Sequence, residues 1–298
     1  MSATTRQLTL PDSNWFMIKL STDKVGYGMF AKRDIPCATV ILREKPLFQW
    51  TDCQMMRTEY EKLDREKKRL FSQLSGSQSS NNGDILDVCQ TNCIQLGTTP
   101  SSGIFHQMSF VNHDCEGNSF WKWFPRNGEQ RLFADRRIKC GEEILVPYHS
   151  FMPRNERQNL LKSFYNFNCQ CKVCERQLRD NGVSDKKWSD FERNREYVFY
   201  SMQTNPSESI KLCDELIDFV KDEYHSSLSL MPDLQFIAGQ VALIGLGDME
   251  RAAHHLKIAI DLKSFIEGED ADLSSHLKIV ALLPVEYHQQ FKNYVKKQ

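Results

Sequence analysis

Three cysteines within six residues, Cys169-x-Cys171-x-x-Cys174, constrain the fold more than any other feature of the sequence. The sequence has no run of about 18 apolar residues, and residues 1–6 lack the apolar core of a secretion signal. We therefore expect an intracellular protein, in the nucleus or the cytoplasm, whose cysteines stay reduced. Closely spaced thiolates in such a protein are typical metal ligands, and a structural zinc ion takes four ligands.

A fourth zinc ligand must come from elsewhere in the chain. Cys115 is the candidate, because it follows the polar pair Asn112-His113 and would tie the segment around residues 169–174 back onto it. A cluster of buried free thiols is the alternative. The other cysteines lack metal-ligand spacing and are expected to be core or surface thiols: Cys37, Cys53, Cys89, Cys93, Cys140 and Cys213.

The first half of the chain, residues 12–150, has the pattern of a mostly β domain without βαβ alternation. Strands are predicted at residues 15–20, 40–42, 108–111, 119–124 and 131–134, and the turn at 125–128 joins the last two strands into a hairpin. Gly26 and Gly28 flank Tyr27 in a loop that could wrap a ligand, although a plain tight turn is the alternative.

Two regions have helical patterns instead. Residues 50–90 carry apolar residues at helical spacing and a polar loop at 75–83, which predicts a helical insertion into the β domain. After a segment at 151–180 that contains the three cysteines, residues 181–298 predict helical hairpins. Asn205 and Pro206 start one helix, Gly247 ends another, Asp248 caps the next, and Pro284 interrupts the last. A tetratricopeptide-like array is the alternative, but the sequence shows no clear self-similarity at the period of about 34 residues that such repeats have.

The charge balance and the histidines suggest no further site. A formal net charge of -1 gives no reason to expect direct nucleic-acid binding. The pair His254-His255 lies on a charged predicted helix and has no third metal ligand, so it is expected at the surface rather than in a metal site. The same is expected of His106.

Four motifs in order resemble the SET domain of protein lysine methyltransferases. They are Gly26-x-Gly28-Met29-Phe30-Ala31, Asn112-His113-x-Cys115-x-x-Asn118, Gly141-Glu142-Glu143 with Tyr148, and the three cysteines. The segment from Arg157 to Cys174 is similar to the SMYD branch and to related fungal SET proteins. The resemblance covers roughly residues 14–176 and implies an α+β fold. That fold has small curved sheets with a pseudoknot, a helical insertion, a zinc-bound post-SET segment and an all-α C-terminal domain.

The resemblance also implies roles for individual residues. S-adenosylmethionine would be contacted by Asn112 and His113, wrapped by Gly26, Tyr27 and Gly28, and approached by Asn92, Tyr148 and Phe167. Tyr148 would lie at the methyl-transfer point and Tyr165 would help to form the lysine channel. Zinc would be bound by Cys115, Cys169, Cys171 and Cys174. The partner would be a lysine-containing protein, histone or non-histone, with no membrane involved.

The sequence departs from the family at several positions. No paired cysteines of a MYND zinc finger follow Phe48, Asp114 stands where serine is usual, Gly117 where proline is usual, and Pro147 where aspartate is frequent. Two functions therefore stay open: a protein-lysine N-methyltransferase that uses S-adenosylmethionine, and an inactive SET-like scaffold that binds the cofactor or a protein partner. Retained Tyr148 and Tyr165 favour the enzyme.

Overall fold

The computed structural model describes residues 13–21, 24, 26–77, 84–149, 152–223 and 228–295. These residues fall into two compact units. One holds the described residues up to 149 together with Arg154–Asn181, and the other holds residues 152–153 together with the chain from Gly182 onwards. The predicted domain limits at residues 12, 150, 151 and 298 lie outside the described residues, as does much of the predicted polar loop, residues 78–83.

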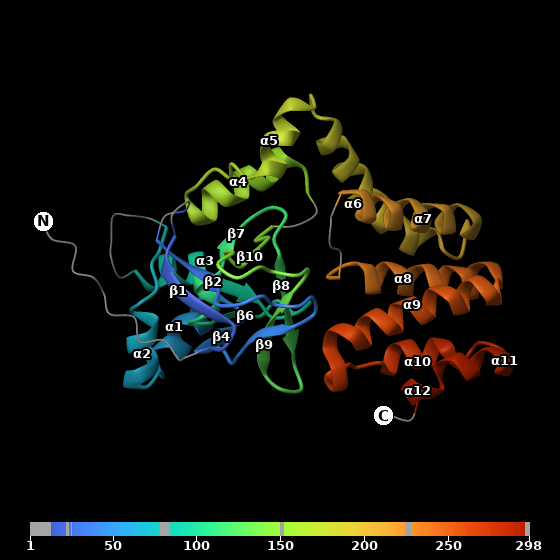
Figure 1. Ribbon diagram of the computed structural model, residues 1–298, viewed down its shortest axis with the longest axis horizontal. Coiled ribbons are helices and arrows are strands. Elements are labelled where there is room, and N and C mark those ends of the chain that lie inside the picture. The colour runs from blue at the N-terminus through green and yellow to red at the C-terminus, as the bar shows by residue number, and fades with distance from the viewer. Residues whose placement is uncertain are drawn as a thin grey trace, which may run out of the picture. The chain divides into compact units, whose positions relative to one another are not determined.

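The first unit is built from four small sheets (Figure 1). Strands β1 (Phe16–Leu20) and β2 (Tyr27–Ala31) pair antiparallel. The second sheet has the order β3-β9-β8, with β3 at Val40–Glu44, β8 at Ser119–Phe124 and β9 at Glu129–Ala134. The third has the order β4-β6-β5, with β4 at Phe48–Trp50, β5 at Cys93–Gln95 and β6 at Ser102–Ile104. The fourth pairs β7 (Asn112–His113) with β10 (Leu145–Val146) in parallel.

The core of this unit lies around β9, the central strand of its sheet. Leu132, Phe133 and Ala134 are fully buried, so both faces of the strand are covered. Such a strand is apolar over consecutive residues, which explains why its sequence does not alternate. The hairpin predicted from the turn at 125–128 is confirmed by the antiparallel register of β8 and β9.

The predicted strand at 108–111 is wrong. Met108–Phe110 form a short 3-10 helix, η1, and only Asn112 and His113 are extended. The carboxylate of Glu44 accepts the backbone N–H groups of Gln107 and Met108 at 2.9 and 3.0 Å and thereby caps this turn. A short apolar run does not by itself distinguish a strand from a helical turn, because both bury it.

The insertion contains helices α1 (Cys53–Glu61), α2 (Arg65–Phe71) and α3 (Ile85–Asn92). The helical spacing expected within residues 50–90 is divided among several helices, because Asp64 accepts the N–H of Lys67 at 2.8 Å and starts a new helix after α1. Helix α4 (Arg154–Tyr165) and helix α5 (Lys172–Arg179) complete the unit.

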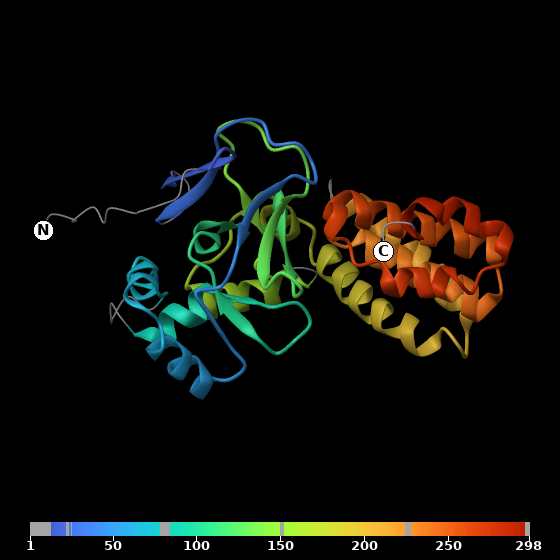
Figure 2. The ribbon, with the colours of Figure 1, turned by 90° about the horizontal axis from the view of Figure 1, so that it is seen from below.

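The second unit is helical (Figure 2). Its long helices are α6 (Val183–Ser201), α7 (Pro206–Glu223), α8 (Met231–Gln240) and α9 (Met249–Glu267). Helix α8 continues as a π-helix, Val241–Leu246, and the short elements α10 (Ser274–Val280), α11 (Val285–His288) and α12 (Lys292–Val295) follow α9. None of the helices in the described part of the chain is long and apolar enough to cross a membrane.

The helix boundaries of this unit follow the predicted capping residues. Asp248 accepts the N–H of Arg251 at 3.0 Å at the start of α9, and Pro206 is the first residue of α7. Gly247 ends the π-helix with φ of 67°, a left-handed conformation that favours glycine. The chain turns again before Pro284, which precedes α11.

Two histidines expected at the surface are buried. His106 is 3% exposed and its Nε2 lies 2.9 Å from Oε1 of Gln73, and His255 is 8% exposed with Nδ1 2.7 Å from Oε1 of Gln235. An amide side chain on a neighbouring element satisfies each ring, and sequence spacing does not reveal such partners. His254 is exposed, as predicted.

Candidate active site and metal centre

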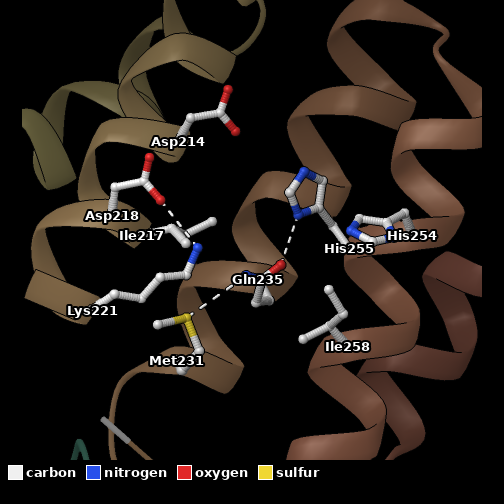
Figure 3. Close-up of a pocket in the computed structure, with 9 residues that line it drawn as sticks. All are labelled: Asp214, Ile217, Asp218, Lys221, Met231, Gln235, His254, His255 and Ile258. Carbon is white, nitrogen blue, oxygen red and sulfur yellow. Dashed lines mark hydrogen bonds and ion pairs between the residues drawn. The ribbon is translucent and has the colours of Figure 1, made fainter. Parts of the chain in front are cut away.

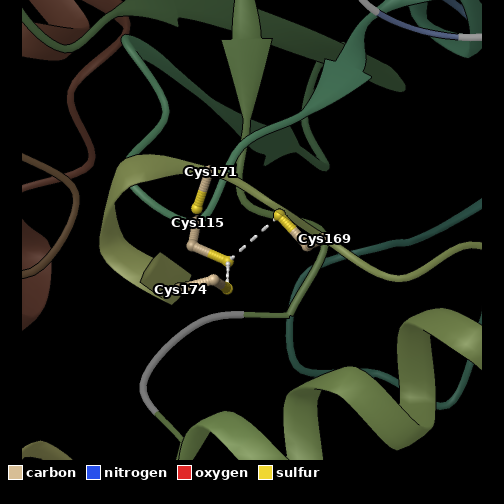
Figure 4. A group of neighbouring side chains, drawn as sticks. All are labelled: Cys115, Cys169, Cys171 and Cys174. Atoms are coloured by element: carbon tan, nitrogen blue, oxygen red, sulfur yellow. Dashed lines mark hydrogen bonds between the residues drawn. The ribbon is translucent and has the colours of Figure 1, made fainter. Parts of the chain in front are cut away.

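The four predicted cysteine ligands converge in the first unit (Figure 4). The Sγ atoms of Cys115, Cys169, Cys171 and Cys174 all lie within 4.8 Å of one another, and Cys115 Sγ is 3.8 Å from Cys169 Sγ and 3.5 Å from Cys174 Sγ. A tetrahedral site with metal–sulfur bonds of about 2.3 Å has edges of about 3.8 Å. The spacing and the all-sulfur donor set therefore fit a metal ion of the zinc class.

The chain positions these sulfurs from three places. Cys115 follows β7, Cys169 and Cys171 lie in the turn after α4, and Cys174 lies in the first turn of α5. Gln158 on α4 holds the turn, because its amide accepts the N–H of Cys169 at 2.9 Å and donates to the Cys169 carbonyl at 2.8 Å. Hydrogen bonds within the cluster lower the pKa of Cys171 and Cys174 and raise the pKa of Cys115 and Cys169, so the four thiols share their protons as one group.

The predicted glycine loop meets the polar pair Asn112-His113 (the polar elbow) through one amide. Nδ2 of Asn112 donates to the Tyr27 carbonyl at 3.1 Å and to Oε1 of Glu143 at 2.8 Å. A Cβ atom at Gly28 would collide with the Glu143 carboxylate and would lie 3.0 Å from the Asn112 amide, so a larger residue here would displace the Glu143 side chain from Asn112. Gly26 has φ of 90° and open space beside it, which leaves its backbone accessible.

Aromatic rings gather where Tyr148, two residues after the end of β10, meets the end of α4. The ring centroids of Tyr148 and Tyr165 are 4.6 Å apart, and those of Tyr148 and His113 are 5.1 Å apart. Phe167 completes the group, with its centroid 5.9 Å from that of His113 and 6.3 Å from that of Tyr165. The hydroxyl of Tyr148 donates to the Val111 carbonyl at 2.9 Å.

Burial keeps these tyrosines neutral. It raises the pKa of Tyr148 well above its usual value, and burial together with the neighbouring Cys93 raises the pKa of Tyr165 to about 12. Both phenols therefore carry their protons at neutral pH. The arrangement presents a neutral hydroxyl oxygen within an aromatic surface, which suits an apolar chain that ends in a cation.

Not every predicted residue joins this group. The side chain of Asn92 donates to the carbonyls of Ser75 and Val88 at 2.9 and 2.8 Å, and within the described part of the chain it makes no hydrogen bond to the other site residues. It ends α3, and the next residue, Cys93, lies close enough to Tyr165 to affect its pKa. The roles assigned to Asn92 and to the other site residues stay predictions.

Three residues near the site were not predicted. Glu143 lies in one of the four motifs, but no role was predicted for it. Its carboxylate accepts from Nδ2 of Asn112 at 2.8 Å and from Oγ of Ser21 at 3.4 Å. Trp121 stacks on Tyr148, with centroids 6.4 Å apart. Arg157 lies beside the sulfurs and is 3% exposed. The sequence offers one indication of this burial, the position of Arg157 four residues before Leu161 on the same helix face.

Two departures from the family pattern contact each other. A Cβ at position 117 would lie 2.9 Å from Cδ of Pro147 and 2.6 Å from the Leu145 carbonyl oxygen. Gly117 therefore packs directly against the backbone of β10 and against Pro147. The two unusual residues form one local arrangement beside the site.

The second unit has a pocket of about 500 Å³ between α7, α8 and α9 (Figure 3). Its polar groups bond within the chain: Asp214 with Arg251, Asp218 with Lys221 at 3.0 Å, and His255 with Gln235 at 2.7 Å. None of the predicted site residues lines it. The group around Tyr148 and the four cysteines is therefore the better candidate for function.

Comparison with known proteins gives consistent relatives. Residues 26–149 match the family model of the SET domain. The chain is 29% identical over 266 residues to histone-lysine N-methyltransferase set5 of Schizosaccharomyces pombe, which covers 85% of this chain and 79% of that protein. It is 30% identical over 132 residues to histone-lysine N-methyltransferase SMYD1 of Homo sapiens, which covers 40% of this chain and 24% of that protein. It is 28% identical over 183 residues to protein-lysine N-methyltransferase SMYD4 of Pongo abelii, which covers 57% of this chain and 21% of that protein.

Proposed function

The chain contains a SET domain of the type found in set5 and the SMYD proteins, and on this premise we propose that it methylates lysine side chains of proteins with S-adenosylmethionine. One observation carries the proposal. The ring centroids of Tyr148 and Tyr165 lie 4.6 Å apart, and the ring of Tyr148 also contacts that of His113, the neighbour of Asn112, at 5.1 Å between centroids. The tyrosine that follows β10, the polar elbow and an aromatic surface thus lie together, as lysine methylation needs.

The reaction requires a neutral lysine amine. Removing its proton at pH 7 costs about 4.6 kcal/mol for an intrinsic pKa near 10.4, at about 1.36 kcal/mol per pKa unit. Burial against the rings of Tyr148, Tyr165 and Phe167 lowers the pKa of an inserted lysine, because the charged form loses its hydration there. The neutral phenols add no negative charge that would oppose this shift.

S-adenosylmethionine, when bound, supplies a methyl group on a positively charged sulfur. Gly26, Tyr27 and Gly28 would hold it together with Asn112 and His113, because Gly26 is exposed and the Asn112 amide fixes the Tyr27 carbonyl beside the polar elbow. The Tyr148 hydroxyl directs its proton to Val111, which leaves its oxygen lone pairs for weak contacts with a polarised methyl group. Alignment of donor and acceptor supplies much of the rate.

Zinc is the metal that the four cysteines would hold. A site with four thiolate ligands has no open position, so its contribution is structural. Bound there, zinc would join Cys115, next to the polar elbow, to the turn that follows Tyr165, and the four cysteines would then fix two parts of the aromatic group relative to each other. Metal binding and local folding are coupled in such sites.

The substrate is a lysine-containing protein, with histones as one class to test, since the relatives set5 and SMYD1 are named histone-lysine methyltransferases and SMYD4 a protein-lysine methyltransferase. The purified chain is incubated with methyl-labelled S-adenosylmethionine and a mixed protein extract that includes histones. Mass spectrometry should locate the label on lysine Nζ. Cofactor binding by calorimetry without transfer to any protein would instead support the inactive scaffold.

A further inference from the structure

Arg157 is a buried cation against the thiolate cluster. It lies on α4 and is 3% exposed, and its Nε donates to Cys115 Sγ at 3.0 Å. Its Nη2 lies 3.7 Å from Cys174 Sγ and donates to Oε1 of Gln177 at 2.7 Å. The guanidinium therefore spans two of the four sulfurs and is held in place by an amide on α5.

Burial makes the charge of this residue significant. Four thiolates around one Zn²⁺ leave about two negative charges on the site. A charge in a buried site is costly unless it is paired and hydrogen-bonded. Arg157 offsets one of these charges and donates directly to a ligand atom, and hydrogen bonds with a charged donor are stronger than neutral ones.

The neighbouring Gln158 gives an internal comparison. Its amide donates to Cys174 Sγ at 3.3 Å and to the Cys169 carbonyl at 2.8 Å, so it orients the ligand turn without bringing charge. Both residues contact Cys174, but Arg157 alone of the two donates to Cys115, while Gln158 fixes the backbone of Cys169. Residues around a metal ligand set its orientation and basicity.

We propose that Arg157 is the positioning residue that retains zinc in the four-cysteine site, by supplying the counter-charge to Cys115 and Cys174. The inference rests on the zinc site of the proposed function, but does not need the methyl transfer. It predicts that loss of the guanidinium weakens zinc retention even where the four cysteines are intact.

The test compares zinc retention among full-length variants. Wild type, Arg157→Gln, Arg157→Lys and the control Lys162→Gln, an exposed position on the same helix, are purified with zinc. Metal content is measured by mass spectrometry, and zinc release to a chromogenic chelator is followed in time. Circular dichroism checks that each variant is folded.

Arg157→Gln should release zinc about 10- to 100-fold faster than wild type, the usual effect of removing a group that supports a metal ligand. Arg157→Lys keeps the charge but loses the Nε donor, and should fall between the two. Lys162→Gln should release zinc at the wild-type rate. If Arg157→Gln does not fold, the comparison of Arg157→Lys with wild type decides.

Wild-type release rates in the soluble Arg157 variants overturn the proposal and leave the zinc site standing. Wild-type protein without zinc overturns both the site and the proposal. Zinc release that changes as predicted in a protein without methyl transfer supports the role of Arg157 and argues against the enzymatic function, so the two failures are distinguishable.

Discussion

The backbone N–H of Tyr148 donates to Nδ1 of His113 at 3.0 Å, while Nε2 of the same ring lies 3.3 Å from Cys115 Sγ. An N–H can only donate, so Nδ1 must be unprotonated and the proton of the neutral ring lies on Nε2, facing the sulfur. Burial lowers the pKa of His113 to about 3, which keeps the ring neutral. One imidazole therefore connects the cysteine cluster to the tyrosine proposed at the methyl-transfer point.

Replacing this imidazole should disturb both ends of the connection. His113→Ala leaves the Tyr148 N–H without its acceptor, which costs about 1–3 kcal/mol of unfolding free energy. Methyl transfer should fall roughly tenfold or more, as for other groups that support a metal ligand. Denaturant unfolding and a transfer assay measure the two effects. His254→Ala, at an exposed position, should change neither; a His113→Ala variant with wild-type activity would contradict the connection.

Tyr148→Phe should remove methyl transfer while zinc content and fold stay intact. The variant loses the hydroxyl that donates to the Val111 carbonyl at 2.9 Å, together with the oxygen proposed to face the methyl group. We expect a loss of at least about 100-fold in kcat, the scale seen when one hydrogen-bonding group of an active site is removed. Tyr197→Phe, on a half-exposed tyrosine of α6, is the matched control. Unchanged transfer would exclude Tyr148 from the reaction.

Cys171→Ser should release the metal. The site would keep three sulfurs and one poor ligand, and the turn around Tyr165 and Phe167 should lose its fixed position because metal binding and local folding are coupled. Elemental analysis measures the zinc, and near-ultraviolet circular dichroism follows the tyrosines. Cys140→Ser, at an exposed thiol, should retain the metal. Equal zinc in both variants would count against the ligand set.

Gly117→Ala should destabilise the protein. The new Cβ would lie 2.6 Å from the Leu145 carbonyl oxygen, and a strand backbone cannot move away cheaply, so we expect a loss of about 1–3 kcal/mol. Combining it with Pro147→Ala removes the second close contact and should restore part of that loss. Chemical denaturation of the single and double variants measures this coupling. Wild-type stability of Gly117→Ala would show that the β10 backbone yields easily.

Glu44 should give the protein a stability that depends on pH. Burial raises the pKa of its carboxyl group to about 7, from a usual value of 4.5. The folded protein therefore keeps this proton up to about pH 7, whereas the unfolded chain releases it near pH 4.5. The free energy of unfolding should fall as pH rises between these values, by at most about 3 kcal/mol, and then level off.

The measurement compares unfolding of wild type and Glu44→Gln from pH 5 to pH 8. The variant lacks this titration, so the stability of wild type should decline relative to the variant over that interval. Glu61→Gln removes a carboxylate whose side chain is 72% exposed and should run parallel to wild type. Parallel curves for Glu44→Gln would refute the raised pKa.

Local chemistry made part of this structure predictable. Asp248 and Pro206 fix helix starts through one side-chain acceptor and one fixed dihedral angle, and these effects need no distant partner. The four cysteines were predictable because metal ligands have few substitutes. The resemblance indicated the neighbours of Tyr148, which no spacing in the sequence could supply.

The errors arose where a distant residue decided the local structure. Glu44 turns residues 108–110 into a helical turn from more than 60 positions away, and Gln73 satisfies the buried His106. Glu143 belongs to a motif that was recognised, but its contact with Asn112 depends on how β2, β7 and β10 meet. Such contacts follow from tertiary packing, which sequence periodicity does not encode.

The parallel pairing of β7 with β10 has a consequence for how the protein acquires activity. Only two residues of each strand pair, Asn112 with Leu145 and His113 with Val146, so the pairing cannot persist until the intervening chain has closed. Refolding protein should regain its helical signal before its capacity to transfer methyl groups. Enzymatic turnover would then report the completion of the native topology, and a nascent chain would be inert until its cysteine-rich turn had emerged.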